Sequence, residues 1–565
     1  MPRTVGIGHQ DFSKIRENNY FYIDKTLFIK EWWERGDNVT LITRPRRFGK
    51  TLIISMTEQF FSVNYQNRTD LFEGLSIWKE EKYHGLQGKY PVISLSFADV
   101  KETSFIQARK KICRIIKSLY NKSGFLLESG LLNKAEQADF NKISTDMEDN
   151  EASYSLKVLS DYLCRYFGRK VIILLDEYDT PMQEAYLNGY WDELSGFTRN
   201  LFNATFKNNP YMDRAIMTGI TRISKESVFS DLNNLKVVTT TSNEYTDCFG
   251  FTEEEVFAAL DEFGLSGRKQ EVKEWYDGFI FGGRSGIYNP WSVINYLDSK
   301  KIETYWANTS SNSIAGKLIR ESNKNIKQDF EILLNGGSII TGVDEQVVYN
   351  QLNAKKGAIW GFLLAGGYLK VLSSGFREQT GSFSYELALT NKEVHTMFQN
   401  IICDWFSGVN DNYNDFIKAL MLGDIKAMNV YMNRVAMETF SYFDTGKKPS
   451  CDEPERFYHG FVLGLVAGLA GRYIITSNRE SGFGRYDVML EPSSKEDSYI
   501  IMEFKVQDME DEKSLKDTVK AALDQIEKKK YASSIIAKGI PEPDIRKYGF
   551  AFCGKKVLIG DSTTL

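Results

Sequence analysis

The chain has 565 residues, of which 42% are hydrophobic, 13% aromatic and 26% charged, with only 11 prolines. This composition excludes collagen-like, low-complexity and wholly disordered chains, because the apolar fraction is large enough to build packed cores. The 70 basic and 75 acidic residues leave a net charge of −5, so the chain as a whole lacks the basic field of a dedicated nucleic-acid binder. At roughly 150 residues per domain, the length predicts about three to four domains.

The sequence gives no signal for a membrane span, for secretion or for zinc. The longest apolar stretch, residues 461–471, is rich in glycine and shorter than the roughly 18 residues that a membrane-spanning helix needs. No apolar segment follows the basic residue at the N-terminus. The six cysteines form no CxxC pair and the four histidines do not cluster. We therefore expect a cytoplasmic protein without membrane contact, in which any metal is a hard cation held by carboxylates.

The first 250 residues alternate short apolar runs with helical stretches. Strands are predicted at 39–43, 92–97, 171–175, 215–219 and 236–240, and helices at 108–120 and 154–167. Several of the apolar runs are nearly continuous, which is typical of strands that are buried on both faces of a parallel sheet. A polar stretch at 134–152 is predicted to be an exposed loop or insertion. Residues 1–250 are thus expected to form an α/β domain with a parallel sheet.

A second region is predicted to begin at residue 251, where Thr252 is placed to cap a helix and Glu255 to complete a capping box. From 251 to 445 the pattern is mostly helical, and we describe this part as a helical or winged-helix-like middle region. Within it, 360–373 predicts a helix followed by a strand, and 385–389 predicts a partner strand.

The last part of the chain predicts a third domain. Residues 444–454 have the lysine, proline and acidic content of a linker. Residues 455–565 predict the order helix, strands, helix and two more strands, which describes a small αβ domain.

A phosphate-binding loop is predicted between the strand at 39–43 and the helical run that follows, where the chain reads RPRRFGKT. A loop of this kind surrounds an anion with backbone N–H groups and a helix N-terminus. Lys50 would reach the β and γ phosphates, and the Thr51 hydroxyl would bind magnesium. The general pattern begins with a glycine where this chain has Arg44, so a chance Gly-Lys-Thr in a basic turn is the alternative. The predicted nucleotide-binding residues here are Arg46, Arg47, Phe48, Gly49, Lys50 and Thr51.

A pair of carboxylates follows another predicted strand, in VIILLDEYDT. Asp176 at the strand end can hold magnesium, and Glu177 can orient or activate the attacking water. The alternative is a helix cap or a surface turn, but the combination with the loop favours an ATP site. Arg222, in MTGITRIS, is a candidate contact to the γ-phosphate, with a surface or ion-paired arginine as the alternative.

The stretches RPRRFGKTL, LLDEYDTP, GITRIS, YDGF and YNPWSV are similar to those of a bacterial AAA-ATPase-like family that carries a C-terminal PD-(D/E)XK nuclease-superfamily domain. The loop of that family typically reads RPRRFGK[ST], so Arg44 is no departure from it. The resemblance covers most of the chain and implies a P-loop NTPase core of the AAA/ASCE-like type. It also implies an additional strand between the two nucleotide motifs, for which the separation of Lys50 and Asp176 leaves room at 92–97.

A second carboxylate site is predicted near the end of the chain. In YIIMEFKV, strand alternation puts Glu503 and Lys505 on one face, and Asp487 precedes them in GFGRYD. Asp487 and Glu503 would bind one or two divalent ions, Mg²⁺ or Mn²⁺, and Lys505 would stabilise developing charge or position the water in phosphodiester hydrolysis. A cross-strand salt bridge on a solvent-facing sheet is the alternative.

The order of these residues resembles the PD-(D/E)XK core, which continues into a helix, here predicted at 515–531. By this resemblance Gln525 on that helix would reach the metal site. As an alternative, Gln525 is a surface glutamine that only hydrogen-bonds a strand end.

Two functional hypotheses follow. In the first, an ATP-binding and ATP-hydrolysing protein is coupled to a magnesium-dependent nuclease acting on DNA or RNA. Its catalytic residues are Glu177, Asp487, Glu503, Lys505 and Gln525, and its metal ligands are Thr51, Asp176, Asp487 and Glu503. In the second, the chain is a nucleotide-dependent switch or scaffold whose nuclease-like domain binds nucleic acid or a protein without cleaving it. The oligomeric state stays open, with a homo-oligomer as one alternative.

Overall fold

The structure is a computed structural model, in which the following part of the chain is described. The described residues are 2–223, 228–229, 232–307, 313–322, 324–334, 336–344, 356–377, 382–407, 410–440, 462, 466, 469, 472–477, 480–481, 484–485, 487–494, 497–508, 511–554 and 556–564. The predicted linker at 444–454 lies outside them. The chain divides into two compact units, Met1–Ile314 with Ile340–Val394 and Ala315–Ile339 with His395–Leu565.

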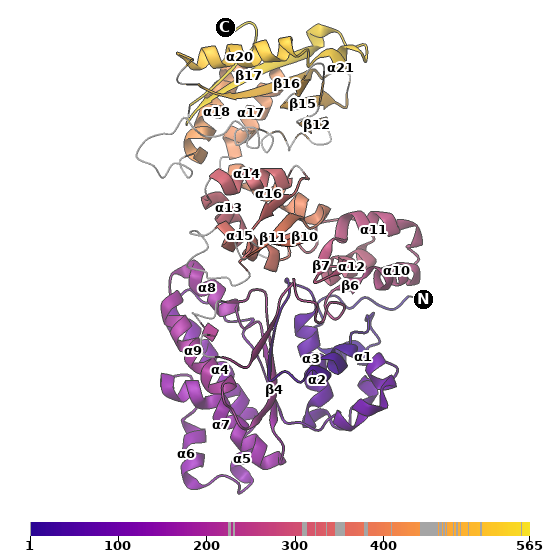
Figure 1. Cartoon of the computed structure of the whole chain (residues 1–565), viewed down its shortest axis with the longest axis vertical. Helices are drawn as coiled ribbons and strands as arrows, with labels where there is room; N and C mark the ends of the chain where they lie inside the picture. Colours follow the sequence, from indigo (N-terminus) through magenta and orange to yellow (C-terminus); the bar gives the residue numbers. More distant parts are fainter. Residues whose placement is uncertain are drawn as a thin grey trace. The chain divides into compact units, whose positions relative to one another are not determined.

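The first unit is built on a parallel five-stranded sheet with the order β2-β3-β4-β1-β5. Its strands are β1 (Val39–Thr43), β2 (Val92–Ser96), β3 (Val171–Asp176), β4 (Met212–Gly219) and β5 (Leu235–Val238). Every residue of β1 and β3 is buried. Helices cover both faces of the sheet, which explains the continuous apolar runs and confirms the predicted parallel sheet (Figure 1).

The helices lie in two layers, one on each face of this sheet. One layer contains α1 (Phe12–Glu17), α2 (Leu27–Arg35) and α3 (Lys50–Phe61). The other contains α4 (Phe105–Lys122), α7 (Asp149–Phe167) and α9 (Trp191–Phe206), and α7 packs on both of the others (Figure 1). Short helices connect them: α5 (Phe125–Glu128), α6 (Lys134–Lys142), α8 (Thr180–Asn188) and 3₁₀ turns at Val63–Tyr65, Thr69–Leu71, Ser76–Lys79 and Glu81–Leu86.

The strand expected between the two nucleotide motifs in the sequence is present, and a different strand separates them in the sheet. The predicted strand at 92–97 forms as β2, but it lies at the sheet edge beside β3. β4 comes later in the sequence and lies between β1 and β3. Sequence order predicts which strands form, whereas lateral order depends on how the intervening helices cross the sheet, which the strand patterns do not encode.

The polar stretch at 134–152 is not a loop, contrary to our expectation. It forms α6 and the first residues of α7. The Asn133 side chain accepts hydrogen bonds from the N–H groups of Ala135 and Glu136, and the Glu136 carboxylate accepts one from the N–H of Asn133, which makes a capping box. Phe140 anchors this short helix against Tyr120, with ring centroids 4.8 Å apart. The helix cap and one buried aromatic contact therefore stabilise α6, although its apolar periodicity is weak.

The rest of the first unit combines helices with two small antiparallel sheets. The capping box of Thr252 and Glu255 is confirmed at the start of α10. The helix at 356–365 and the paired strands β10 and β11 confirm the predicted helix, strand and partner strand. The elements are β6 (Phe251–Thr252), α10 (Glu253–Glu262), a 3₁₀ turn (Ser266–Arg268), α11 (Lys269–Tyr276), β7 (Phe279–Phe281), β8 (Arg284–Tyr288), α12 (Pro290–Ser299), α15 (Lys356–Ala365), β10 (Leu369–Arg377) and β11 (Ser382–Leu389).

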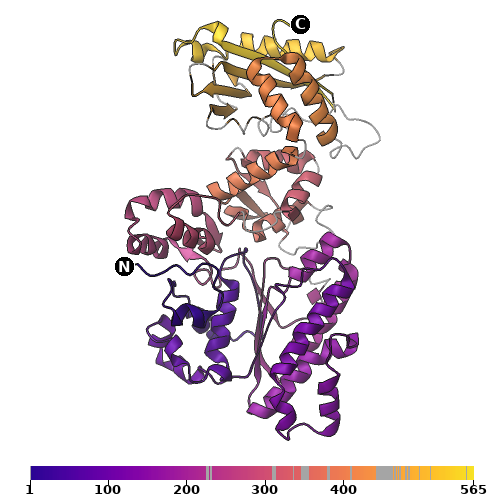
Figure 2. The same cartoon turned by 180° about the vertical axis from the view of Figure 1, so that it is seen from behind.

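The second unit contains a mixed five-stranded sheet with the order β12-β15-β16-β17-β18. Met502 and Phe504 of β16 pack in one core with α17 and α18, whereas Ile501 packs with α20 on the opposite face. This alternation is the one predicted, and Figure 2 shows the two helices in front of the sheet. The sheet strands are β12 (Tyr473–Ser477), β15 (Val488–Pro492), β16 (Tyr499–Val506), β17 (Ile545–Cys553) and β18 (Lys556–Gly560).

The remaining elements of the described chain are mostly helical. They are α13 (Ser313–Glu321), α14 (Lys324–Leu334), β9 (Ile339–Thr341), α16 (Lys392–Ser407), α17 (Asn410–Leu422), α18 (Ile425–Phe440), β13 (Glu480–Ser481), β14 (Gly484–Arg485), α20 (Leu515–Lys528), α21 (Ser533–Ile536) and a 3₁₀ turn (Glu542–Asp544). Among the described residues, we find no helix with the length and apolar character required to cross a membrane.

Candidate functional site

The loop between β1 and α3 has the geometry of an anion-binding turn. Gly49 precedes α3 in the left-handed backbone conformation, with φ of 82°, and Arg47 also has positive φ, 64°. Glycine adopts this conformation without strain, so Gly49 allows the chain to turn directly into the helix. The first N–H groups of α3 have no acceptor within the helix, and this helix end therefore favours an anion.

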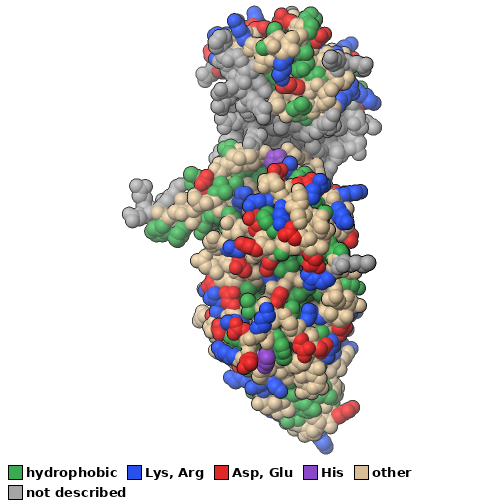
Figure 3. Space-filling view, turned by 90° about the vertical axis from the view of Figure 1, so that its right-hand side faces the viewer, with side chains coloured by type: hydrophobic (Ala, Val, Ile, Leu, Met, Phe, Trp, Pro, Cys, Tyr) green, Lys and Arg blue, Asp and Glu red, His purple; other side chains and the backbone are tan. Residues whose placement is uncertain are grey.

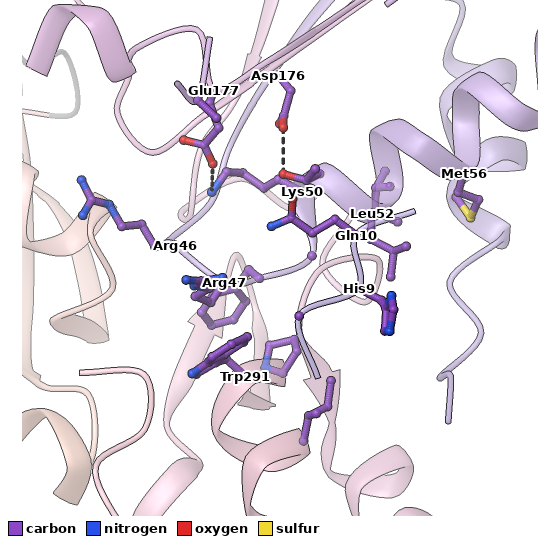
Figure 4. Close-up of a pocket in the computed structure, with 18 of the residues that line it drawn as sticks. His9, Gln10, Arg46, Arg47, Lys50, Leu52, Met56, Asp176, Glu177 and Trp291 are labelled. Atoms are coloured by element: carbon purple, nitrogen blue, oxygen red, sulfur yellow. Dashed lines mark hydrogen bonds and ion pairs between the residues drawn. The ribbon is translucent and has the colours of Figure 1, made fainter. Parts of the chain in front are cut away.

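Lys50, the first residue of α3, extends across this loop. It is buried, and its Nζ donates to the carbonyl oxygens of Arg44 at 3.2 Å and Pro45 at 3.0 Å. The same Nζ lies 3.4 Å from Oε1 of Glu177 (Figure 4). The loop lysine and the glutamate after β3 therefore face each other in one site.

Thr51 and Asp176 form the second contact between the two motifs. The Thr51 hydroxyl donates to Oδ2 of Asp176 at 2.7 Å, and the Thr218 hydroxyl of β4 donates to Oδ1 at 2.5 Å. Burial, followed by the charge of Glu177, raises the pKa of the Asp176 carboxyl. Hydroxyl and carboxylate oxygens are the ligands that Mg²⁺ prefers, so this pair fits a hard divalent cation.

A cavity of about 550 Å³ contains these groups, which is within the range of roughly 300–1,000 Å³ found for ligand pockets. His9 and Gln10 of the N-terminal segment line it together with the phosphate loop (Figure 4). Apolar and aromatic side chains complete the lining, among them Tyr22, Ile23, Met56, Trp291 and Ile294. Polar groups for phosphates and apolar surface for a base thus meet in one cavity.

Arg44 explains why the loop needs no glycine at its first position. Its backbone is outside the left-handed region, and its side chain is fully buried. The guanidinium donates to the carbonyl oxygens of Thr43, Thr239 and Glu244 and lies 4.7 Å from the ring centroid of Phe281. Burial lowers the pKa of Arg44 to about 10. Arg44 therefore fixes the loop to its surroundings.

The other predicted loop residues have separate contacts. Arg46 lines the cavity and donates to Oε1 of Gln183 at 2.9 Å. The guanidinium of Arg47 lies 4.3 Å from the ring centroid of Trp291, and the ring of Phe48 packs on Phe279. The arginines thus lie at the cavity, whereas Phe48 anchors the loop in the core.

A buried aspartate ties the end of β3 to the end of β4. Oδ2 of Asp179 accepts hydrogen bonds from the N–H groups of Ile220 and Thr221 at 3.0 and 2.8 Å. It also accepts a hydrogen bond from Nε2 of Gln183. Oε1 of the same Gln183 accepts a hydrogen bond from the guanidinium of Arg46. Asp179 therefore links the segment after β4 to the phosphate loop.

Arg222 is placed differently from the other predicted nucleotide contacts. It follows β4 by three residues, and the described cavity lining does not include it. Thr218, one residue before the end of β4, is the group from this strand that reaches the site.

The C-terminal candidate residues meet at one end of the second unit's sheet. Oδ2 of Asp487 accepts a hydrogen bond from the N–H of Phe504 at 2.8 Å, which places Asp487 beside Glu503 on β16. Glu503 is buried and accepts a hydrogen bond from Nε2 of Gln525 on α20. That same nitrogen lies 3.2 Å from the hydroxyl oxygen of Tyr531. Asp487, Glu503 and Gln525, which are 38 positions apart in sequence at most, are therefore brought together.

Lys505 is two residues after Glu503 on the same strand, and both side chains lie on the face of β16 that packs toward α20. Two carboxylates fit a hard cation, since both supply oxygen ligands. Within the described ranges, no group of three or more His, Cys, Asp or Glu side chains is arranged to hold a metal ion.

Three residues of these sites were not among the predicted ones: Thr218, Asp179 and Gln183. The register of β3 and β4 pairs Leu175 with Met217, which sets Thr218 beside Asp176. A correct lateral strand order would have pointed to Thr218. Asp179 stands in the same LDEYD stretch as the predicted pair, but its acceptor role requires the position of β4. Gln183 carries no sequence signal of its own.

Comparisons with known proteins agree with these sites. A family model described as predicted AAA-ATPase matches residues 6–229, and one for the PD-(D/E)XK nuclease superfamily matches residues 453–562. A protein of Azotobacter chroococcum mcd 1, described as uncharacterized and located in the vnfD 5′ region, is 29% identical over 326 residues. This match spans 56% of the present chain and 56% of that protein, so it covers about half of each.

Among solved structures, the Aeropyrum pernix ORC2 protein in ADPNP and ADP complexes is 11% identical, with 71% of this chain and 96% of that chain covered. Its TM-score is 0.21, which is too low to support a conclusion about the fold. The two family matches coincide with the two sites described above. Residues 6–229 therefore match the predicted AAA-ATPase family, and residues 453–562 match the PD-(D/E)XK nuclease superfamily.

Proposed function

We propose that the first unit binds and hydrolyses ATP with Mg²⁺. The contact between Thr51 and Asp176 at 2.7 Å carries this proposal, because it joins the two nucleotide motifs in the cavity where Lys50 faces Glu177. The N–H groups at the start of α3 and the Lys50 ammonium would bind the phosphates. Thr51 and Asp176 would hold Mg²⁺, which, when bound, neutralises charge on the phosphate oxygens.

Glu177 would orient the attacking water and accept its proton. The water oxygen forms the new bond to the γ-phosphorus, the bond from that phosphorus to the bridging oxygen breaks, and ADP leaves. Glu177 has positive φ, 53°, a conformation that costs a non-glycine residue about 1–2 kcal/mol and that recurs at active sites. This strain supports the assignment of Glu177 rather than a role in packing.

Steady-state ATP hydrolysis tests the first proposal. Lys50→Ala should abolish ATP binding, because the site loses its buried cation. Glu177→Gln keeps the shape of the side chain and should lower kcat by about 100-fold or more with little change in ATP affinity. Unchanged binding in Lys50→Ala would refute the loop assignment.

We propose that the second unit hydrolyses phosphodiester bonds in DNA or RNA with Mg²⁺ or Mn²⁺. The proposal is supported by the approach of Asp487 to Glu503, with Lys505 on the same strand face and Gln525 in contact with Glu503. Asp487 and Glu503 would bind the ion, which lowers the pKa of an attacking water. Lys505 would stabilise the charge that develops on the phosphate, and Gln525 would orient Glu503.

The surface shown in Figure 3 carries interspersed basic and acidic side chains over the described part of the first unit. This mixture agrees with the net charge of −5 and argues that nucleic-acid contact is local. A nuclease assay with Glu503→Gln and Lys505→Ala tests the proposal. Binding without any cleavage by the unmodified protein would instead support the scaffold hypothesis.

We further propose that the chain acts in the cytoplasm and that the ATP state of the first unit controls cleavage by the second. The proposed division into 1–250, 251–445 and 455–565 assigns one activity to each end. Cleavage measured with ATP, with ADP and without nucleotide tests this control.

A further inference from the structure

One backbone oxygen of the phosphate loop is held by side chains from far along the chain. The carbonyl oxygen of Arg46 accepts a hydrogen bond from Nε1 of Trp306 at 3.0 Å and from Nδ2 of Asn289 at 3.4 Å. Both donors lie outside residues 6–229, the part that matches the AAA-ATPase family model. The loop therefore depends on residues that its own motif does not contain.

A single buried carboxylate organises these donors. Oε1 of Glu393 accepts hydrogen bonds from the N–H of Trp306 at 2.7 Å and of Ala307 at 3.4 Å. Its Oε2 accepts from the hydroxyl of Ser292 at 2.8 Å. Ser292 is in the first turn of α12, which Asn289 caps. Glu393, at 0% exposure, thus fixes both segments that reach Arg46.

We propose that Glu393 is a positioning residue for the nucleotide site, acting through Trp306 and Asn289 on the Arg46 carbonyl. The inference rests on the proposed binding of ATP by this loop. It gives Asn289, Trp306 and Glu393 a role in nucleotide binding that the two nucleotide motifs leave unassigned.

The peptide bond between Arg46 and Arg47 links the contacts on the Arg46 oxygen to the orientation of the Arg47 N–H. In a trans peptide the C=O and N–H groups point in opposite directions, so the direction of one sets the direction of the other. Because Trp306 and Asn289 hold the Arg46 oxygen, the Arg47 N–H points to the side away from them. Arg47 also has positive φ, 64°, which costs about 1–2 kcal/mol and therefore needs support from its surroundings.

Packing around the same peptide supports the role. The Trp306 ring lies 5.6 Å from the ring of Phe279 and from that of Tyr368, so the indole N–H is held in one direction. The Arg47 guanidinium stacks on Trp291, the second residue of α12. Loss of the Arg46 contacts would thus free the peptide without unpacking the indole.

The test compares the ATP affinity of variants, measured by titration of the full-length protein with a fluorescent ATP analogue and Mg²⁺. Trp306→Phe keeps an aromatic ring but removes the donor to Arg46. We expect its Kd to rise about fivefold, the change that corresponds to one hydrogen bond of about 1 kcal/mol. Glu393→Gln keeps an acceptor for Trp306 and should retain more affinity than Glu393→Ala.

Tyr276→Phe is the matched control. The Tyr276 hydroxyl donates to the carbonyl oxygen of Glu303 at 2.9 Å and accepts from its N–H at 3.1 Å. It therefore anchors the segment before Trp306, but these contacts do not involve the phosphate loop. We expect the unfolding temperature to fall by a similar amount in Tyr276→Phe and in Trp306→Phe. ATP affinity should fall only in Trp306→Phe.

Each outcome bears on a different claim. If Trp306→Phe binds ATP as tightly as the unmodified protein, or if Tyr276→Phe loses as much affinity, the positioning role is wrong and the proposed ATP site stands. If the unmodified protein and Lys50→Ala bind equally, or neither binds, the proposed ATP site is contradicted and the positioning role falls with it.

Discussion

Thr51 shows most directly how one side chain can be tested without disturbing its surroundings. Its hydroxyl donates to Asp176 at 2.7 Å, and the proposed Mg²⁺ site needs that oxygen. Thr51→Val has nearly the same shape but no hydroxyl, so we expect Mg²⁺ to lose its ability to strengthen ATP binding. Thr51→Ser keeps the hydroxyl and is the control. Calorimetric titration with and without Mg²⁺ measures the effect, and an equal Mg²⁺ dependence in Thr51→Val would contradict the assignment.

Asp179 gives a prediction about stability. Its Oδ2 is the acceptor for Ile220, Thr221 and Gln183 in a fully buried position. Asp179→Ala removes that acceptor and should destabilise the first unit by about 3 kcal/mol or more. Asp179→Asn keeps one acceptor oxygen and should cost less. Chemical denaturation followed by hydrogen–deuterium exchange in peptides of the first unit distinguishes these cases, and equal stability of all three proteins would refute the role.

The residues of both sites differ in how far the sequence can predict them. Lys50, Thr51, Asp176 and Glu177 lie in two short motifs whose chemistry is recognisable before any fold is known. Thr218 and Gln183 are single polar residues without a motif, and they matter because the sheet and α8 bring them to the site. The assigned roles of the predicted residues stay predictions until the substitutions are measured.

At the scale of elements, the YDGF stretch has a steric explanation. Gly278 has φ of 120°, and a Cβ built there would lie 2.1 Å from the carbonyl oxygen of Thr390. Gly278→Ala would therefore have to push β7 away from the segment that precedes α16. We expect a loss of stability of about 2 kcal/mol or more. Gly283→Ala, where the nearest atom is 4.0 Å away, is the control. Equal unfolding temperatures for the two variants would contradict this explanation.

Glu393, in the first turn of α16, predicts that the stability of the segments it holds depends on pH. Burial raises the pKa of Glu393 to about 7, from an ordinary value of 4.5. The folded chain therefore holds the Glu393 proton more tightly than the unfolded chain does. The contribution of Glu393 to the stability of the fold is fully present below about pH 4.5 and is lost as the pH rises through about 7. We expect protection of residues 289–307 to fall across this range in the unmodified protein.

Glu393→Gln does not titrate and serves as the control for that measurement. Hydrogen–deuterium exchange of both proteins, compared at equal pH, removes the intrinsic pH dependence of exchange. Because glutamine is neutral like the protonated carboxyl, the difference in protection between them should grow as the pH rises from about 5 to about 7 and then level off. A difference that is independent of pH would contradict the assigned pKa.

The elements that the sequence predicts well are those with a strong local signal. The five strands of the first sheet form within a few residues of the predicted positions, because continuous apolar runs define buried parallel strands. The position of β4 between β1 and β3 could not be predicted, because lateral order follows from helix crossings over long sequence separations. The helix α6 was missed because a capping box, rather than apolar periodicity, defines it.

At the scale of the whole molecule, the chain combines two sites of similar chemistry in two compact units. In the first site Lys50 lies beside the carboxylate of Glu177, and in the second Lys505 is on the same strand as Glu503, two residues further on. This arrangement explains how an acidic chain can be proposed to act on phosphates, because a bound divalent cation supplies positive charge locally. The net charge therefore excludes a general nucleic-acid binder but not a metal-dependent nuclease.

The most direct test of the two-site account is one cleavage experiment on the full-length chain. Purified protein is incubated with Mg²⁺ or Mn²⁺ and a mixture of single-stranded and double-stranded DNA and RNA, with and without ATP. The account predicts cleavage that Glu503→Gln abolishes, and a response to ATP that Lys50→Ala abolishes while Glu503 is intact. Binding of these nucleic acids without cleavage under every condition, or cleavage that persists in Glu503→Gln, would contradict it.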